Sequence, residues 1–250
     1  MLVTAFTAPT PPTPSPLGQV VFPAGASASR KAQPPTDGLL AGPTRTIATR
    51  EHLFCEGDPA SHVYRVEAGH ICIYRMMPDG RRQVIDFAYP GDTIGLGAIG
   101  THASNAQATT KTRVRCVATT TLLDAARKNP ALGFELYQAL SQELLAAREH
   151  VFTVSQCTAA ERVAAFLVAL SRRNERRGEN PAEIVLPMTR TDIADFLGLT
   201  IETVSRTLSK FRAEGLIELE HCILVTIRDA EALAALVAGE GARGSKLQAA

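Results

Sequence analysis

The sequence has no tryptophan, only 5% aromatic residues and no excess of one charge, because 26 Lys and Arg oppose 25 Asp and Glu among 250 residues. A nearly neutral chain has no overall field that would recruit nucleic acid or an anionic membrane, so any such binding must be local. Apolar runs of about 18 residues are absent, and the first residues carry neither a basic segment nor a long apolar one. These absences predict a cytoplasmic protein without a membrane span, a secretory signal or a membrane partner.

Closely spaced cysteines and catalytic motifs are also missing. The five cysteines are odd in number and well separated, so we expect reduced, mostly buried thiols. No two histidines lie at i, i+2, and neither G-x-S-x-G nor a P-loop occurs. The stretch Gly95–Gly100 satisfies G-x-G-x-x-G, but no helix-forming segment follows it to bind a dinucleotide phosphate. We therefore expect no enzyme activity, no metal site and no cofactor.

Proline is concentrated at one end of the chain. Residues 1–43 hold nine of the fifteen prolines and only three charged residues. Such a segment buries too little apolar surface to offset the entropy of ordering it, so we predict a disordered N-terminal tail. At the other end, residues 238–250 are predicted to form a flexible C-terminal tail.

Short strand-like runs dominate residues 44–129, and Gly, Pro or Asp follows several of them. The clearest runs are Val63–Val66, Ile71–Tyr74, Gln83–Phe87 and Arg113–Val117. Strands of about five residues with this punctuation are typical of an antiparallel sandwich or barrel. We therefore predict a β-rich domain here.

Beyond this domain the apolar period becomes helical and predicts a helix from Pro130 to Gln156, about 40 Å long, within residues 130–157. Its apolar seam consists of Leu132, Leu136, Leu140, Leu144, Ala147, Val151 and Val154. A long helix with a narrow apolar seam usually buries that seam against a partner, so we predict a dimerisation helix. The alternative is that it packs only onto the β-rich domain of its own chain.

A further domain is predicted over residues 158–237. The segment Thr158–Glu161 has the capping-box pattern and starts a new helix. Thr189 can cap a short helix that ends at a glycine turn, and Thr200 can cap a second helix. Two strand-like runs within residues 216–227 can then pair as a hairpin. This order predicts a winged helix-turn-helix and, with the N-terminal strands, an α+β fold.

In a helix-turn-helix the second helix enters the major groove, and its first two turns face the base edges. Glu202, Ser205 and Arg206 lie at i, i+3 and i+4, so they share one exposed helix face. Arginine can donate two hydrogen bonds to guanine, and glutamate can accept one from cytosine N4. We predict that these residues read bases. The alternative is an exposed Glu–Arg pair worth about a few tenths of a kcal/mol to the helix.

The charge of this domain argues against strong DNA binding. Residues 158–230 contain ten Lys and Arg and eleven Asp and Glu, a net charge of −1. Phosphate neutralisation supplies much of the affinity of DNA-binding proteins, so helix N-termini and hydroxyls must contribute here, helped by Lys210 and Arg212. The candidate hydroxyl donors are Thr189, Thr191, Thr200 and Thr203. We therefore expect modest non-specific binding and a dependence on dimerisation.

The order of β-rich domain, long helix and winged helix-turn-helix, together with the segment Thr200–Arg206, resembles the CRP/FNR family of bacterial transcription regulators. The likeness covers residues 45–235 approximately and includes Phe54–Asp58 and Tyr89–Gly95, which look like the family's β-roll turns. It implies an antiparallel, jelly-roll-like β-roll, a homodimer that binds double-stranded DNA, and contacts with RNA polymerase.

The resemblance also implies residue roles. Glu202 and Arg206 match the family's base-reading pair, and Ser205 marks the FNR branch. Ile201 stands where CRP-type proteins have a base-reading arginine, which favours FNR-type palindromes with TTGA and TCAA half-sites. The positions that match contacts to the DNA backbone are Thr189, Arg190, Thr191, Thr200 and Thr203.

The effector chemistry of the family is not matched. Cys116 looks like one ligand of the iron–sulfur cluster of FNR, but no cysteine precedes Cys55, so four thiolates are not available. The stretch that would bind cyclic AMP, residues 95–106, lacks the family's Glu and Arg, which leaves a phosphate uncompensated. What remains looks like the FixK branch, whose members lack the cluster and act in microaerobic, nitrogen-fixation or denitrification gene control, usually as activators.

An effector-gated sensor on the same scaffold is the alternative. Haem could use His70 and Cys72 if they share one face of a strand. A thiol switch could use Cys157, between the long helix and the reader, or Cys222, in the wing, if either were exposed and acidic. A small-molecule effector is a third possibility, but packed, structural side chains are the preferred interpretation.

Overall fold

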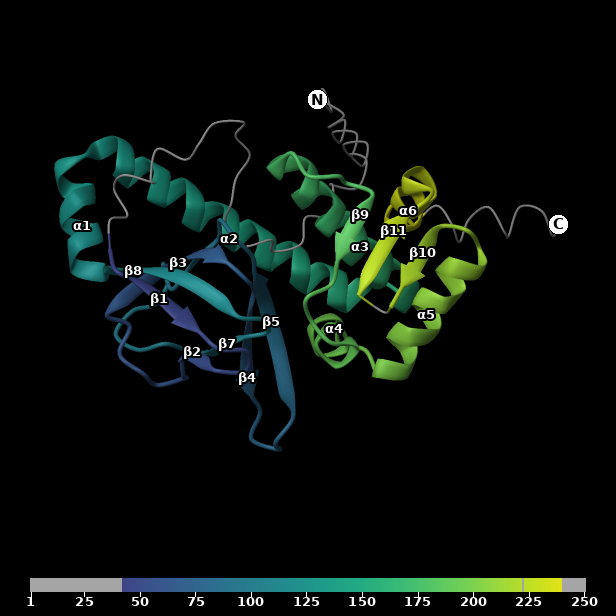
Figure 1. The fold of residues 1–250 in the computed structure, drawn as a ribbon, viewed down its shortest axis with the longest axis horizontal. Helices are drawn as coiled ribbons and strands as arrows, with labels where there is room; N and C mark the ends of the chain where they lie inside the picture. Colours follow the sequence, from purple (N-terminus) through teal and green to yellow (C-terminus); the bar gives the residue numbers. More distant parts are fainter. Residues whose placement is uncertain (1–41, 222, 240–250) are drawn as a thin grey trace, which may run out of the picture.

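The computed structural model describes residues 42–221 and 223–239. The predicted N-terminal tail lies outside this range except for its last two residues, and so do Cys222 and almost all of the predicted C-terminal tail. Within the range, a β-domain, a long helix and a smaller helical domain follow one another along the chain (Figure 1). No helix among these residues is both long enough and apolar enough to cross a membrane.

Two four-stranded antiparallel sheets form the β-roll, with strand orders β1-β8-β3-β6 and β2-β7-β4-β5. The strands are β1 Thr44–Ile47, β2 His52–Phe54, β3 His62–Ala68, β4 Ile71–Met76, β5 Arg82–Ala88, β6 Thr93–Ile94, β7 Asn105–Ala108 and β8 Thr112–Ala118. Burial alternates at the start of β8, where Val114 enters the core and Arg113 stays outside, and Val66 of β3 packs in the same core. The four strand-like runs of the sequence fall within β3, β4, β5 and β8, and the α+β fold with an antiparallel β-roll is confirmed.

Helix α1 spans Thr119–Lys128, and α2 spans Pro130–Gln156, the range that the helical periodicity predicts. The side chain of Asn129 begins α2 by accepting hydrogen bonds from the backbone N–H groups of Ala131 and Leu132. Sequence analysis did not predict α1.

The apolar seam of α2 does not lie on a single face. Leu132 is buried against α1 and the β-roll, and Leu136 packs beside it. The expectation that the whole seam meets a partner chain is therefore wrong at these two residues. Most steps of the seam are four residues, and each such step advances about 40° around the helix axis, so the seam drifts from the inner to the outer face. The exposed large apolar residues of α2 are Phe134, Tyr137, Leu140, Leu144, Leu145, Val151 and Phe152.

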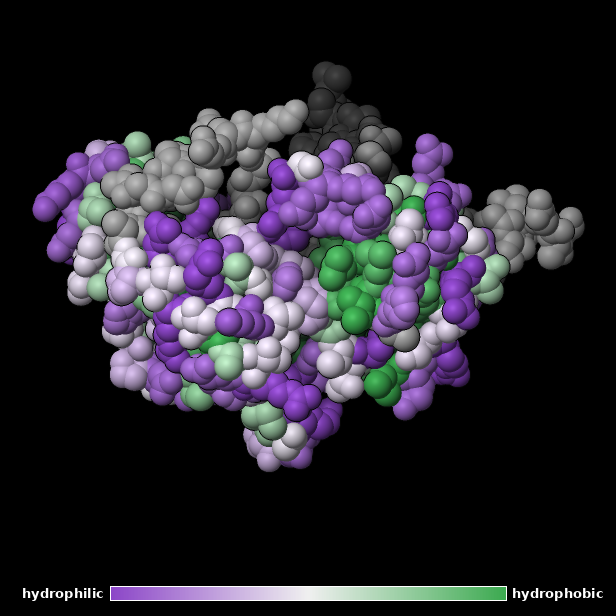
Figure 2. All heavy atoms as spheres, in the orientation of Figure 1, coloured by the Kyte–Doolittle hydropathy of each residue, from purple (hydrophilic) through white to green (hydrophobic). Residues whose placement is uncertain are grey.

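The C-terminal domain is a winged helix-turn-helix, as predicted. Its elements are α3 Ala159–Arg177, β9 Glu183–Val185, α4 Arg190–Leu197, α5 Ile201–Ala213, β10 Ile217–Glu220, β11 Leu224–Ile227 and α6 Ala230–Val237. The predicted capping box is present at Thr158, and Gly198 makes the predicted tight turn with a φ of 63°. The wing is a three-stranded sheet, because β9 pairs with β11. Figure 2 shows an apolar patch over these strands, where Val185 and Ile223 are exposed.

One apolar cluster joins the two domains. Phe87 and Tyr89, from β5 and the turn after it, belong to the same buried cluster as the helices of the C-terminal domain. Phe196 of α4 lies at its centre, with ring centroids 5.4 Å from Phe87 and 5.9 Å from Phe166 of α3. The ring of His150 on α2 stacks on Phe196 at 4.3 Å. The winged domain is thus packed against the β-roll and α2 of its own chain.

Candidate nucleic-acid interface

Helix α5 presents a polar face to solvent. The side chain of Thr200 begins the helix by accepting a hydrogen bond from the N–H of Thr203, and Val204, Leu208 and Phe211 bury the opposite face. Glu202, Ser205 and Arg206 are all exposed on the first two turns. The structure therefore brings the three predicted base readers together on one accessible surface.

Glu202 is held in its ionised form. Its own backbone N–H and the Thr200 hydroxyl bond the carboxylate, and Arg206 lies near enough to act on it, so its pKa is lowered. A carboxylate at this position accepts hydrogen bonds and donates none, which is the chemistry that a cytosine amino group requires.

The N-terminus of α4 is a second polar surface. Thr189 begins the helix through a capping box with Asp192, whose Oδ2 accepts from the Thr189 N–H at 2.8 Å and from its hydroxyl at 2.7 Å. The hydroxyl proton of Thr189 is thus directed into the protein, so Thr189 orients the helix end. The backbone N–H groups of Arg190 and Thr191 follow in the first turn, where helix geometry favours anions.

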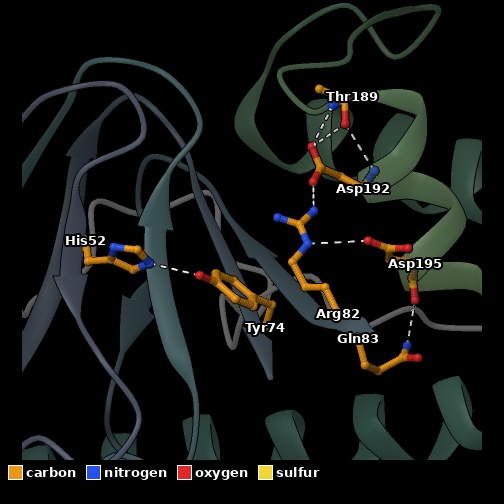
Figure 3. Close-up of polar contacts among 7 residues, drawn as sticks. All are labelled: His52, Tyr74, Arg82, Gln83, Thr189, Asp192 and Asp195. Atoms are coloured by element: carbon orange, nitrogen blue, oxygen red, sulfur yellow. Dashed lines mark hydrogen bonds and ion pairs between the residues drawn. The ribbon is translucent and has the colours of Figure 1, made fainter. Parts of the chain in front are cut away.

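Behind this helix end lies a contact that sequence analysis missed. Arg82 at the start of β5 pairs with Asp192 through Nη2 and with Asp195 through Nε, the latter at 3.3 Å. The side-chain amide of Gln83 donates to the Asp195 carbonyl oxygen at 2.6 Å (Figure 3). Arg82 is separated from Asp192 by 110 residues, and no local pattern links the two positions.

A buried ion pair makes another link between the domains. Arg173 of α3 pairs with Asp92 in the turn before β6, and the two side chains are 6% and 1% exposed. The Arg173 guanidinium also lies 4.1 Å from the centre of the Tyr89 ring. Burial raises the pKa of Asp92, and the nearby Arg173 opposes that shift.

The loop between β6 and β7 does not fit a cyclic nucleotide. Residues 95–104 contain no Arg, Lys, Asp or Glu, so nothing in this loop balances a phosphate charge. His102 is buried and stacks on Phe54 with ring centroids 3.6 Å apart, which fills the base of the loop with the protein's own side chains.

Three of the candidate haem and redox residues, His70, Cys72 and Cys157, lie in the described part of the chain, where they pack against neighbouring side chains or backbone. Cys72 belongs to the buried cluster between the domains, and burial raises its pKa to about 12. His70 lies edge-to-face against Tyr89, and burial lowers its pKa to about 4. Burial and Glu161 raise the pKa of Cys157, which makes its thiol less reactive. In the described part of the chain, no three His, Cys, Asp or Glu side chains gather as metal ligands would.

Taken together, the helix-turn-helix, the wing and the exposed polar face of α5 define a DNA-binding protein. Comparison with known protein families agrees. Residues 161–236 match the Crp-like helix-turn-helix domain, and residues 44–129 match the cyclic nucleotide-binding domain.

Characterised proteins resemble the chain over most of its length. It is 37% identical to the nitrogen fixation regulation protein FixK of Azorhizobium caulinodans over 210 residues, which cover 84% of this chain and 85% of that protein. It is 38% identical to FixK of Rhizobium meliloti, covering 79% and 89%. The fumarate and nitrate reduction regulatory protein of Escherichia coli is 36% identical over 77% of each chain.

Among solved structures, FixK2 from Bradyrhizobium japonicum superposes with a TM-score of 0.74 at 34% identity, covering 78% of this chain and 97% of that one. The chain therefore belongs to the CRP/FNR family of transcription regulators. Within that family it is a FixK- and FNR-like DNA-binding regulator, and the relatives it matches are regulators rather than enzymes.

Proposed function

We propose that the protein is a homodimeric transcription activator that reads TTGA–TCAA palindromes without an iron–sulfur cluster or a cyclic nucleotide. Its targets belong to microaerobic, nitrogen-fixation or denitrification gene control, a proposal supported by its likeness to regulators named for nitrogen fixation and for fumarate and nitrate reduction. It acts in the cytoplasm and contacts RNA polymerase through loops of the β-roll.

The observation that carries this proposal is the exposed row of Glu202, Ser205 and Arg206 on the first turns of α5. Arg206 donates to guanine O6 and N7, Glu202 accepts from cytosine N4, and Ser205 bonds the neighbouring base edge. Thr200, Thr203 and the first turn of α4 face the DNA backbone, with Arg190 and Thr191 at that helix end and Thr189 orienting it.

The homodimer is supported by the outer face of α2. Tyr137, Leu144 and Val151 are 67%, 53% and 63% exposed, although they are apolar and lie along one side of a 27-residue helix. A second copy of α2 would bury this face and place two α5 helices about one DNA turn apart.

Independence from an effector is supported by the loop between β6 and β7, which offers a phosphate no cation, and by the cysteines. A cluster of the FNR type needs four thiolates gathered around one site. Cys72 lies on β4 and Cys116 lies on β8, so these two thiols belong to different sheets. The purified protein is therefore expected to bind DNA in air and without added ligand.

Fluorescence anisotropy tests the proposal with three duplexes: a TTGA–TCAA palindrome, a CRP-type palindrome and a scrambled sequence. Tight binding to the first alone, by aerobic and ligand-free protein, supports the FNR-type reader. Equal binding to all three contradicts sequence reading by α5. No binding to any duplex contradicts effector independence and favours a gated sensor. Transcription in vitro from a promoter with the palindrome then distinguishes an activator from a repressor.

A further inference from the structure

The winged domain carries two carboxylates where it is expected to approach phosphate. Asp192 and Asp195 lie one turn apart on α4, and residues 158–230 have a net charge of −1. Asp192 caps the same helix end that the proposed function turns toward the DNA backbone. Like charges repel most strongly where water is partly excluded, and the Asp192 side chain is only 10% exposed. A cation close to both carboxylates would reduce this repulsion.

Arg82 of the β-roll supplies that cation. Its guanidinium pairs with both carboxylates, through Nη2 to Asp192 and through Nε to Asp195. The side chain is 26% exposed, so the contact is shielded more than an ordinary surface pair and less than a buried one. The planar guanidinium can hold two carboxylates in a fixed arrangement, which a lysine cannot do.

Neighbouring residues hold Arg82 in place. Its guanidinium lies 5.0 Å from the centre of the Tyr74 ring, and the Tyr74 hydroxyl contacts His52 Nε2 at 2.9 Å. Figure 3 shows the resulting row of side chains, which runs from the β-roll through Arg82 to Asp192 and Thr189. These contacts fix the position of α4, and with it α5, relative to the β-roll. In a dimer, the position of α5 on each chain sets the distance between the two α5 helices.

We propose that Arg82 is a positioning residue for DNA binding, which neutralises Asp192 and Asp195 and holds the reader in its binding orientation. The proposal rests on the proposed function, in which α4 and α5 bind DNA. Arg82 acts through the two aspartates rather than by contacting a phosphate itself. DNA affinity therefore depends on a side chain of the β-roll, outside the DNA-binding domain.

The variant Arg82→Met tests this, with Arg81→Met as its matched control. Arg81 is adjacent in sequence, and its 77% exposed side chain pairs only within the hairpin, with Asp79 at 2.7 Å. We expect Arg82→Met to bind the duplex preferred by the wild type about tenfold more weakly and Arg81→Met to bind like the wild type. Part of this loss should disappear as the salt concentration rises, because screening weakens the repulsion between the unpaired carboxylates and the phosphates. Binding within about twofold of the wild type would overturn the proposal.

A second substitution tests the mechanism. Adding Asp195→Asn to Arg82→Met removes one unpaired carboxylate and should recover part of the lost affinity, whereas a general folding defect would not be relieved. If Arg82→Met does not fold, Arg82→Lys replaces it. That variant keeps the positive charge but loses the planar guanidinium that contacts both aspartates. An affinity equal to the wild type would contradict the proposed positioning of α4 by Arg82.

Hydrogen exchange provides a readout that needs no DNA. Amides of residues 190–197 should exchange faster in Arg82→Met than in the wild type or Arg81→Met, because the end of α4 is released. Failure of the wild type to bind the palindrome would count against the proposed function alone. Unchanged exchange at α4 would count against the positioning role of Arg82.

Discussion

At the scale of single residues, Arg206 is expected to decide sequence specificity. Replacing it with alanine removes the paired hydrogen bonds to guanine O6 and N7 and should cost about 1–3 kcal/mol of binding free energy on the palindrome. Discrimination at that one base pair should be relaxed. Anisotropy titrations with duplexes substituted at the guanine measure both effects.

Arg212→Ala is the matched comparison for Arg206→Ala, because Arg212 lies in the last turn of α5, away from the base readers. We expect it to weaken cognate and scrambled DNA equally and to lower the salt slope by about one, as loss of a phosphate contact does. An equal loss on both duplexes for Arg206→Ala would show that Arg206 contacts only the backbone.

The exposed helix face that carries the proposed base readers could be predicted from sequence, because all of its determinants are local. Thr200, the apolar spacing that includes Val204 and the i, i+4 relation of Glu202 and Arg206 fix which residues face solvent. The contact of Arg82 with α4 could not be predicted from sequence, because the partner carboxylates lie 110 and 113 residues away. Only the folded chain shows that the start of β5 meets α4.

At the scale of elements, α2 has an inner apolar face that packs on its own chain and an outer apolar face that is exposed, the proposed dimer contact. Leu144 is 53% exposed, so Leu144→Glu should leave the monomer folded but introduce charge into the proposed dimer contact. We expect a shift from dimer to monomer in multi-angle light scattering, together with loss of binding to the palindrome. A dimer that persists at the same concentration would place the interface elsewhere.

The inner face of α2 provides the contrasting variant. Leu132 is 1% exposed and packs with Val63, Val117 and Leu122, so Leu132→Ala should lower the free energy of unfolding by about 2–5 kcal/mol through loss of buried surface and a cavity. Denaturant titration measures this change, and the dimer should persist under native conditions. Dissociation without loss of stability would mean that Leu132 faces the partner.

The limits of sequence analysis at this scale follow from helix geometry. The apolar period indicated the helix α2, and Pro130 and the capping box at Thr158 marked its two ends. The period could not show which apolar residues meet the same chain, because two adjoining apolar faces merge into one drifting seam. Likewise α1 was missed, since its apolar positions pack only once the neighbouring strands are in place.

At the scale of the whole molecule, the domains should unfold together. Arg173 and Asp92 form a buried pair across the junction, so Arg173→Met leaves a buried carboxylate without its cation. Breaking such a pair costs about 3–5 kcal/mol, and the double variant Asp92→Asn with Arg173→Met should recover much of the loss. Calorimetry of the single variant is expected to show a lower melting temperature for both domains. A single variant in which only one domain melts earlier would contradict this coupling.

The same junction predicts how stability depends on pH. Asp86 on β5 lies near Asp92 and Glu143, and burial raises its pKa well above 3.8, although Arg173 opposes the shift. A carboxyl with a raised pKa binds protons more readily in the folded state than in the unfolded state, so it destabilises the protein as pH rises above 3.8. Asp86→Asn keeps an oxygen to accept the Phe87 N–H, a bond of 2.8 Å in the wild type, and removes the half-buried charge.

Asp86→Asn should therefore raise the melting temperature most at neutral pH. This advantage should shrink as pH falls toward 3.8 and vanish below it, where the wild-type carboxyl is protonated in both states. Glu67→Gln is the opposing control, because Arg115 and Arg113 lower the pKa of Glu67. Its loss should destabilise the protein at neutral pH, and the difference should vanish in acid. Melting curves of both variants from pH 4 to 7 would have to show opposite signs. A destabilised Asp86→Asn at pH 7 would mean that the ionised carboxylate holds the domains together.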